Sequence, residues 1–262
     1  MPSFFADTNF DNSYSLTTLK SLAHNVMGKS KFLKSKDNLK IFKTSGYFSF
    51  MNDNYYCSGD IGDFYKTDQP GHSHAASLSF ELTLFGERVF VNSGISNYQD
   101  NQQRYFERST KAHNTLEIDH SNSSQVWKSF RLGNRAKIIS YNYKRTDEYY
   151  EINAEHDGYS TNNNSVIHNR AWSFYKKEIK ITDTVRGNFQ SARARYYLHP
   201  DIKFINDNSL CLKSGKIIKL LYKGAELQIK DVEWYPYFNK KQSSTCIELL
   251  LNSDVSQLRV LL

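Results

Sequence analysis

A strict alternation of apolar and polar residues between positions 77 and 84 constrains the fold more than any other feature of the sequence. The apolar members are Leu78, Phe80, Leu82 and Leu84, and the polar members are Ser77, Ser79, Glu81 and Thr83. A period of two residues is typical of a strand with one buried face. Similar short segments follow from residue 39 to the C-terminus, separated by polar turns and with no repeated helix between them. The sequence therefore predicts an all-β fold, a large antiparallel β-sandwich, rather than a parallel α/β sheet.

The composition agrees with one large strand-rich domain. Of the 262 residues, 15% are aromatic and only 4 are proline. Aromatic residues favour strands, and a chain of this length can bury a sizeable core. The net charge is +7, but the Lys and Arg residues are scattered and no recognition motif for nucleic acid is present, so we expect no nucleic-acid partner. A positive field also suits an acidic polysaccharide, although charge alone does not distinguish this from a generic basic surface.

Targeting signals and disulfides are not evident. No apolar run approaches the roughly 18 residues that a membrane helix needs, so we expect no membrane span. Residues 1–10 lack the basic region and apolar core of a secretory signal, which leaves the compartment unassigned. Cys57, Cys211 and Cys246 have no paired or CxxC spacing. This favours three reduced, buried thiols over a disulfide framework or a cysteine–zinc site.

The first 38 residues differ from the rest of the chain. Between Ser15 and Gly28, residues Leu16, Leu19, Leu22 and Val26 fall on one helical face, and Gly28 is a plausible end of the helix. A short helical segment is therefore expected to precede the strands.

Polar residues that suit a functional site are concentrated between Gly71 and Thr115. If the strand begins early enough, His72 and His74 share the parity of its apolar face, although an HxH pair alone could equally be polar residues at a strand end. His113, Asn114 and the run from Tyr98 to Arg108 add imidazole, amide, phenol and guanidinium groups within the same span.

Several ordered motifs resemble the C-terminal domain of the heparinase II/III-like polysaccharide lyases, a family related to alginate lyases. The resemblance covers most of residues 40–205, and its motifs are Gly71-His72-Ser73-His74, Leu78-Ser79-Phe80-Glu81-Leu82, Val91-Asn92-Ser93-Gly94, Tyr98, Arg104, Phe106, Arg108-Ser109-Thr110, Ala112-His113-Asn114-Thr115, Phe130-Arg131, Glu155-His156-Asp157-Gly158-Tyr159 and His199-Pro200. In that family an α-helical toroid precedes the β domain. The resemblance thus implies that residues 1–38 are the helical remnant and linker of a missing toroid, and that residues 39–262 are the β-sandwich domain.

The resemblance also implies site residues for β-elimination on uronic-acid-containing glycans. His72 matches a histidine that faces the active-site cleft, and Tyr98 lies where the alginate-lyase branch has a substrate-contacting tyrosine. Imidazole and phenol groups suit the proton transfers of such a reaction. Arg104, Arg108, Asn114 and His156 are expected to bind substrate, since guanidinium groups hold carboxylates and sulfates in a bidentate manner. Alternatively, either arginine pairs with Glu107 or Asp100, and His156 is held by local backbone bonds. Trp127, Trp172 and Trp234 are expected in the core.

A zinc site at His74, Asn92 and His113 is implied by the same resemblance, with two departures. The family has aspartate where this chain has Asn92, and an amide oxygen is a poor substitute for a carboxylate ligand. A two-residue turn at Gly86-Glu87 would also place Asn92 opposite Glu81, about 20 Å along a straight strand from His74, so the ligands meet only if the chain bends near Ala75-Ala76 or the turn is longer.

Three functions remain open from the sequence. The first is a polysaccharide lyase that acts on an acidic polysaccharide and is incomplete without its toroid, which a separate α-toroid chain could supply. The second is a non-catalytic carbohydrate-binding or scaffold β-sandwich. The third is a cupin-like metal enzyme, which the spacing disfavours because Glu81 follows His74 by seven residues instead of three or four.

Overall fold

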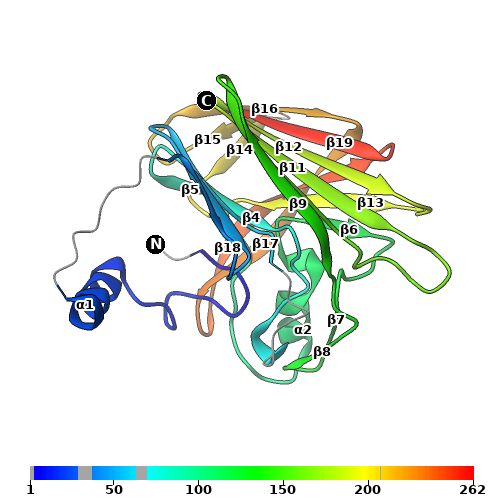
Figure 1. Ribbon diagram of the computed structural model, residues 1–262, viewed down its shortest axis with the longest axis horizontal. Helices are drawn as coiled ribbons and strands as arrows, with labels where there is room; N and C mark the ends of the chain where they lie inside the picture. Colours follow the sequence, from blue (N-terminus) through cyan, green and yellow to red (C-terminus); the bar gives the residue numbers. More distant parts are fainter. Residues whose placement is uncertain (1–2, 29–36, 63–69, 207) are drawn as a thin grey trace.

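Antiparallel sheets make up most of the computed structural model, which describes residues 3–28, 37–62, 70–206 and 208–262 (Figure 1). The predicted all-β class is therefore confirmed. The first sheet has the order β1-β2-β3-β4-β5 and consists of β1 (Leu39–Phe42), β2 (Tyr47–Met51), β3 (Tyr55–Asp60), β4 (Phe80–Leu84) and β5 (Glu87–Phe90).

The second sheet contains eight strands and forms the largest layer. Its order is β14 (Lys203–Asn206), β15 (Ser209–Cys211), β16 (Ile217–Lys223), β19 (Val255–Leu261), β12 (Glu178–Arg186), β11 (Ile167–Tyr175), β10 (Tyr149–His156) and β9 (Ile138–Arg145). The third sheet has the order β17 (Ala225–Tyr237), β18 (Lys240–Leu251), β13 (Ala192–Tyr197) and β6 (Leu116–Ile118). A small hairpin joins β7 (Gln125–Trp127) to β8 (Arg131–Gly133).

The core lies between the inner faces of these sheets. Phe48 of β2 meets Trp172 of β11 at a ring-centroid distance of 4.9 Å, and Phe50 stacks on Phe174 at 4.5 Å. These contacts join the first sheet to the eight-stranded sheet across one apolar cluster, as expected for a sandwich. Trp127 does not belong to this core: it is 49% exposed, so its predicted burial is wrong, whereas Trp172 is fully buried.

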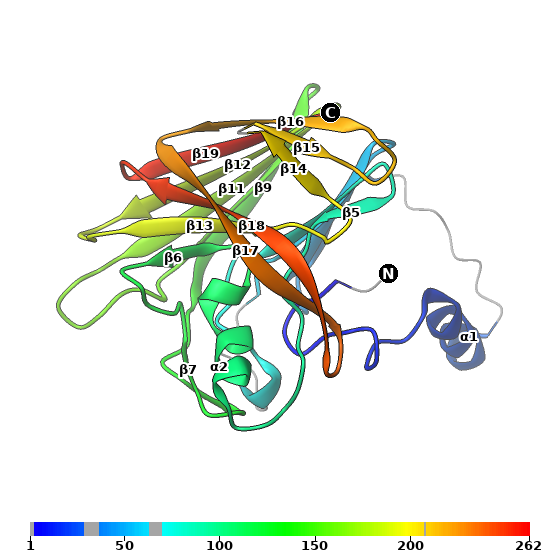
Figure 2. The same cartoon turned by 180° about the vertical axis from the view of Figure 1, so that it is seen from behind.

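The first and third sheets are joined edge to edge where β5 ends. The N–H of Val91 donates to the carbonyl of Tyr197, and the N–H of His199 donates to the carbonyl of Val89. The end of the long β17–β18 hairpin lies beside the short helix α2 (Gln102–Arg108) (Figure 2). Helix α2, which lies in the polar run from Tyr98 to Arg108, is therefore next to the third sheet.

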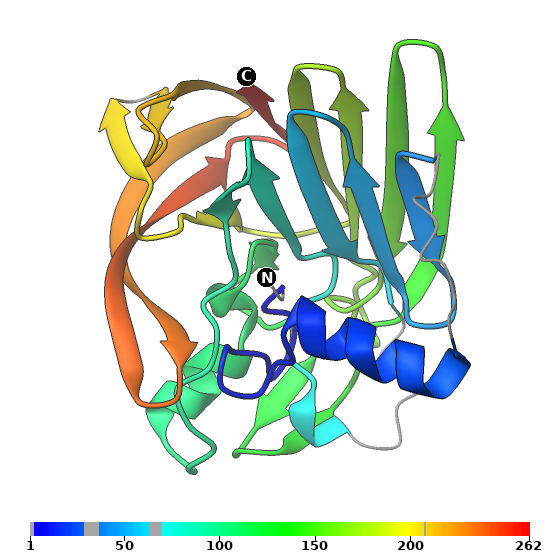
Figure 3. The ribbon, with the colours of Figure 1, turned by 90° about the vertical axis from the view of Figure 1, so that its left-hand side faces the viewer.

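The N-terminal residues divide into a docked segment and an undocked helix. Helix α1 (Leu16–Met27) forms between Ser15 and Gly28, as predicted, but it buries none of its residues and lies beside the sheets (Figure 3). Residues 3–12, which the sequence assigned to the same remnant, pack on the β domain instead. Phe4 is fully buried and stacks on Trp234 at 5.6 Å. Across the described ranges, no helix has the length and apolar character that a membrane crossing requires.

Candidate functional site

The segment that carries the HxH motif is not the beginning of a strand. Pro70–His72 forms one 3₁₀ turn, residues 73–79 bend, and β4 begins only at Phe80. The N–H of Ser79 donates to the carbonyl of Ala76, and Leu78 has a φ of 60°, which is outside the strand region. The prediction that both imidazoles project side by side from the core face is therefore wrong. The His72 side chain is 61% exposed and that of His74 only 1%.

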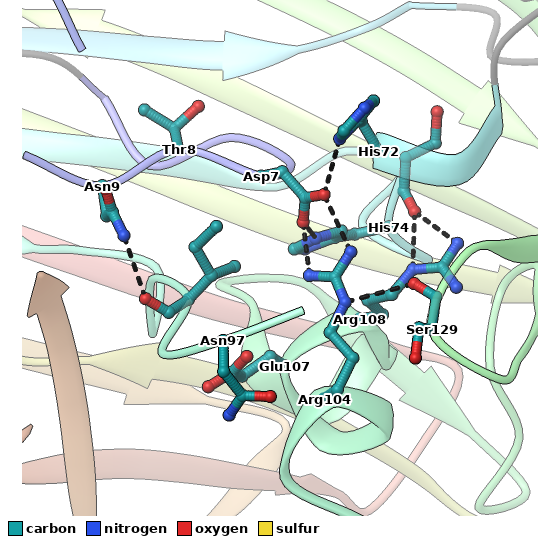
Figure 4. Close-up of polar contacts among 12 residues, drawn as sticks. Asp7, Thr8, Asn9, His72, His74, Asn97, Arg104, Glu107, Arg108 and Ser129 are labelled. Carbon is teal, nitrogen blue, oxygen red and sulfur yellow. Dashed lines mark hydrogen bonds and ion pairs between the residues drawn. The ribbon is translucent and has the colours of Figure 1, made fainter. Parts of the chain in front are cut away.

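The carboxylate of Asp7, from the docked N-terminal segment, lies between these two histidines (Figure 4). Its Oδ2 is 2.9 Å from His72 Nδ1, and its Oδ1 is 2.7 Å from His74 Nε2. Both oxygens also accept from Arg104, with a distance of 2.8 Å between Nη2 and Oδ2. Three cationic or protonatable side chains thus surround one carboxylate whose side chain is only 3% exposed.

Arg104 is presented to Asp7 by the short helix α2. Asn101 caps this helix by accepting from the N–H of Arg104, and Arg104 Nε donates to the carbonyl of Ser129. The guanidinium lies 5.0 Å from the ring centroid of Tyr98 and 5.6 Å from that of Phe130. Tyr98 in turn lies 6.1 Å from the His72 ring. The structure therefore brings His72, Tyr98 and Arg104 into one cluster.

The three predicted metal ligands form a row instead of a shell around one point. His74 Nδ1 is 3.1 Å from His113 Nε2, and the opposite nitrogen of His113, Nδ1, is 3.3 Å from Asn92 Oδ1. Asn92 Oδ1 also accepts from the N–H of Asn114. The bend before β4 brings the three residues together, but Asn92 lies on the side of His113 that faces away from His74.

A zinc ion does not fit this arrangement of donors. Zinc needs its ligands to converge at about 2.0–2.3 Å, and the three predicted ligands do not converge. Within the part of the chain that the structure describes, no three His, Cys, Asp or Glu side chains are grouped so that they could hold a metal ion. We therefore assign no chemistry at this site to a metal.

Burial and charge set the protonation of the cluster. Burial alone would raise the pKa of Asp7, but His74 and Arg104 hold that pKa well below its usual range, so Asp7 is ionised. Burial lowers the pKa of His74, which Asp7 opposes, and burial with the neighbouring His74 lowers the pKa of His113 further. Burial and the charge on Asp7 raise the pKa of Tyr98, so its phenol keeps its proton at neutral pH.

Three residues expected to bind substrate are buried and make their hydrogen bonds within the protein. Arg108 is fully buried and donates to the carbonyls of Ser73, Lys128 and Arg131. Neither Glu107 nor Asp100 is among these acceptors.

Asn114 is likewise buried, with its amide bonded to the backbone of Phe80 and Tyr197. His156 is fully buried, accepts from the N–H of Gly158 and contacts His168 at 3.1 Å. Because none of the three faces solvent, the structure contradicts their expected role and assigns them to positioning the backbone.

A family model for heparinase II/III-like proteins, C-terminal, matches residues 34–258. The chain belongs to this family. Among solved structures, a heparinase III shares 17% identity over 99% of this chain with a TM-score of 0.76. The heparan sulfate lyase HepC from Pedobacter heparinus shares 15% identity over 99% with a TM-score of 0.76. A search of curated proteins gave no match. The chain spans 44% and 43% of the lengths of those two solved chains, and at these identities the likeness shows the shared fold.

Asp7, which lies outside the residues that the family model matches, is the site residue that sequence reasoning missed. Asp7 is 65 residues from His72 and 97 from Arg104, and no motif or spacing connects it to either residue. The only signal was indirect: Phe4 and Phe10 flank Asp7 in a segment without strand or helix pattern, as expected for a segment anchored by aromatic side chains. Phe130, which also borders the cluster, belongs to the Phe130-Arg131 motif, for which the sequence predicted no role.

Proposed function

We propose that this chain is the β domain of a lyase that cleaves uronic-acid-containing polysaccharides by β-elimination. The observation that carries the proposal is the cluster of His72, Tyr98 and Arg104, in which an exposed imidazole lies beside a phenol and above a buried guanidinium. Membership of the heparinase II/III-like family supports the same reaction class.

Each group of the cluster suits one requirement of β-elimination. The reaction needs a counter-charge for the uronate carboxylate, a base for the C5 proton and an acid for the leaving oxygen. Arg104 is fully buried and already holds Asp7 in a bidentate manner, so it can hold the uronate carboxylate in the same way only in the place of Asp7. The exposed His72 can accept a proton, and Tyr98, whose pKa is raised, can donate one.

We further propose that an α-toroid completes this site. The chain spans less than half of the heparinase III and heparan sulfate lyase chains that it resembles. An apolar face of α1 is left uncovered: Leu19 is 48% exposed, Leu22 is 46% exposed and Val26 is 83% exposed. A toroid, on a separate chain or in a longer protein, would supply the remaining catalytic groups. The acidic polysaccharide would then bind between the two domains, with heparan sulfate as the first substrate to test.

The test is an ultraviolet absorbance assay for the unsaturated uronate product on heparan sulfate, alginate and a bacterial capsular polysaccharide. We expect weak or no turnover by this chain alone, and turnover when a heparinase-type toroid is supplied. Robust turnover by the isolated chain would contradict the need for a toroid. Absence of turnover on every substrate in the presence of the toroid would overturn the lyase proposal.

A non-catalytic carbohydrate-binding role is the second candidate, and exposed aromatic residues favour it. Trp127 is 49% exposed and Phe130 45% exposed, and Phe130 lies 6.2 Å from the His72 ring. Exposed rings of this kind can stack on sugars. A His72→Gln variant separates the two candidates: lost turnover with retained binding indicates a lyase. Binding by the wild type without turnover, toroid included, indicates a binding module.

A further inference from the structure

The carboxylate of Asp7 is bound as a ligand would be bound. It receives two guanidinium nitrogens of Arg104 and one ring nitrogen each from His72 and His74, all from the β domain. Planar bidentate pairing with arginine is the arrangement by which proteins hold free carboxylates. The carboxylate itself comes from a different part of the chain, the N-terminal segment of residues 3–12.

That segment is anchored on both sides of Asp7. On one side Phe4 is buried and its N–H donates to Glu81 Oε1; on the other, Asn9 Nδ2 donates to the carbonyl of Ile95. Between the anchors, Ala6 has a φ of 53°, a left-handed backbone conformation that is unfavourable for an alanine. The chain therefore accepts backbone strain next to Asp7 in order to deliver this carboxylate.

The surroundings of the bound carboxylate suit a sugar acid. Tyr98 and Phe130 lie within 5.0 and 5.6 Å of the Arg104 guanidinium, and His72, on the opposite side of the carboxylate, is largely exposed. A uronate in the place of Asp7 would put its carboxylate on Arg104 and its ring beside an aromatic edge and an exposed imidazole. The proposed function assigns proton transfer to His72 and to the phenol of Tyr98, which would both lie next to that sugar ring.

We propose that His72, His74 and Arg104 form a carboxylate-binding site, and that Asp7 fills it as a tethered internal ligand. A uronate of the polysaccharide then binds at this site only when the segment 3–12 withdraws. The identity of the competing ligand rests on the proposed function; the existence of the carboxylate site does not. A tethered group of this kind acts at an effective concentration in the millimolar range. A single free uronate therefore competes poorly, whereas a polymer with additional contacts can displace the segment.

The experiment measures the melting temperature of the whole chain in sodium acetate and in sodium chloride at matched ionic strength. Asp7→Ala leaves a space of carboxylate size beside Arg104. We expect acetate to raise the Tm of this variant by about 2–4 °C in a saturable manner, and to leave the wild type unchanged because Asp7 already fills the site. An Asp7→Ala variant that responds equally to both salts would overturn the proposal.

Two variants are compared with Asp7→Ala. Asp7→Asn keeps the side-chain volume, so acetate must displace the amide in order to bind, and we expect its Tm to rise by less than that of Asp7→Ala. Asp11→Asn changes an aspartate of the same segment that accepts from the N–H of Phe238, away from the cluster. It should behave as the wild type. An acetate response in Asp11→Asn equal to that of Asp7→Ala would show a general salt effect and contradict the proposal.

If Asp7→Ala does not fold, Asp7→Asn provides a second measurement. A neutral amide competes less well than a carboxylate for Arg104, so glucuronate or acetate should bind Asp7→Asn at least about tenfold more tightly than the wild type, as followed by NMR of the His72 ring. Equal or weaker binding would overturn the proposal. Acetate binding without binding of any uronate oligosaccharide would support the carboxylate site and count against the proposed function. Failure of the proposed function can therefore be distinguished from failure of the carboxylate site.

Discussion

Two buried rows of side chains in this protein have the same order of groups but different surroundings. The Asp7 row consists of Arg104, Asp7, His74, His113 and Asn92, and the Asp183 row consists of Arg170, Asp183, His168 and His156. In each row an arginine holds an aspartate with two nitrogens, the aspartate meets a histidine at 2.7 Å, and a second histidine follows at 3.1 Å. Equivalent groups in equivalent order therefore do not by themselves mark a functional site.

The rows differ in how they end and in what delivers the carboxylate. The Asp183 row ends at a donor, the N–H of Gly158, so two neutral imidazoles supply all the protons that its contacts need. The Asp7 row ends at an acceptor, Asn92 Oδ1, so two neutral imidazoles leave one contact without a proton. All four members of the Asp183 row are fully buried and belong to adjacent strands, whereas Asp7 belongs to an N-terminal segment beside the exposed His72. The Asp183 row is therefore the closed row, and the Asp7 row is the open row, in which withdrawal of residues 3–12 would expose Arg104.

The largest expected effect is the loss of stability when the closed row is broken. Asp183→Asn leaves the buried Arg170 without its counter-charge, and breaking a buried ion pair in this way costs about 3–5 kcal/mol. Urea unfolding measures this difference. Asp7→Asn should cost clearly less, because its segment can move and let water reach Arg104. Equal losses would show that the Asp7 row is as rigid as the Asp183 row.

Acid should progressively weaken the closed row, in which Asp183 is ionised. Burial alone would raise the pKa of Asp183, but the charge of Arg170 and the hydrogen bonds from His168 and Arg170 hold it well below its usual range. A carboxyl whose folded pKa is lower than its unfolded value, about 3.9, stabilises the protein above that value. This contribution is lost as the pH falls below about 4. The difference in unfolding free energy between the wild type and Asp183→Asn should therefore shrink there, and a difference independent of pH would contradict the assigned charge.

The sequence predicted the sheets better than their edges, for physical reasons. The apolar stretches at residues 226–229 and 246–251 are parts of much longer strands, β17 and β18, of 13 and 12 residues. The outer half of β18 is polar and mostly exposed, and that of β17 buries three consecutive residues, Trp234 to Pro236, so no apolar alternation marks either half. The HxH segment failed in the opposite way, because its parity suggested a strand that the turn at Leu78 prevents.

Site residues were predictable only where a motif held them. The motifs placed His74, Asn92 and His113 near one another, and the structure brings them into contact, though as a row. No motif contained Asp7. Nor could the sequence tell the closed row from the open one, since His156 and His74 are both histidines in family-like motifs. Their difference depends on neighbours 12 and 67 residues away.

A smaller effect separates the exposed histidine from the buried one. His156→Gln should cost about 1–3 kcal/mol of unfolding free energy, because it leaves buried polar partners unsatisfied. His72→Gln changes a side chain that is 61% exposed and should shift stability by no more than about 0.5 kcal/mol. The effects on turnover in the presence of a toroid should be the reverse. His72→Gln should lose turnover, whereas the fraction of His156→Gln that is folded should retain it. Loss of turnover in His156→Gln but not in His72→Gln would contradict the catalytic role proposed for His72 and point to the Asp183 row instead.

The smallest expected change in stability comes from removing the hydroxyl of Tyr98, which lies beside Arg104 of the open row. Tyr98→Phe keeps the ring that contacts His72, Phe130 and Phe238, so the unfolding free energy should change by about 0.5 kcal/mol or less. If the phenol donates its proton to the leaving oxygen, turnover with a supplied toroid should fall by about 10²–10⁴-fold while polysaccharide binding is retained. Tyr235→Phe is the matched control, because Tyr235 lies on β17 and its hydroxyl bonds Glu233 outside the cluster. Unchanged turnover in Tyr98→Phe would show that Tyr98 is not the acid and would leave it as a residue that packs beside Arg104 and His72.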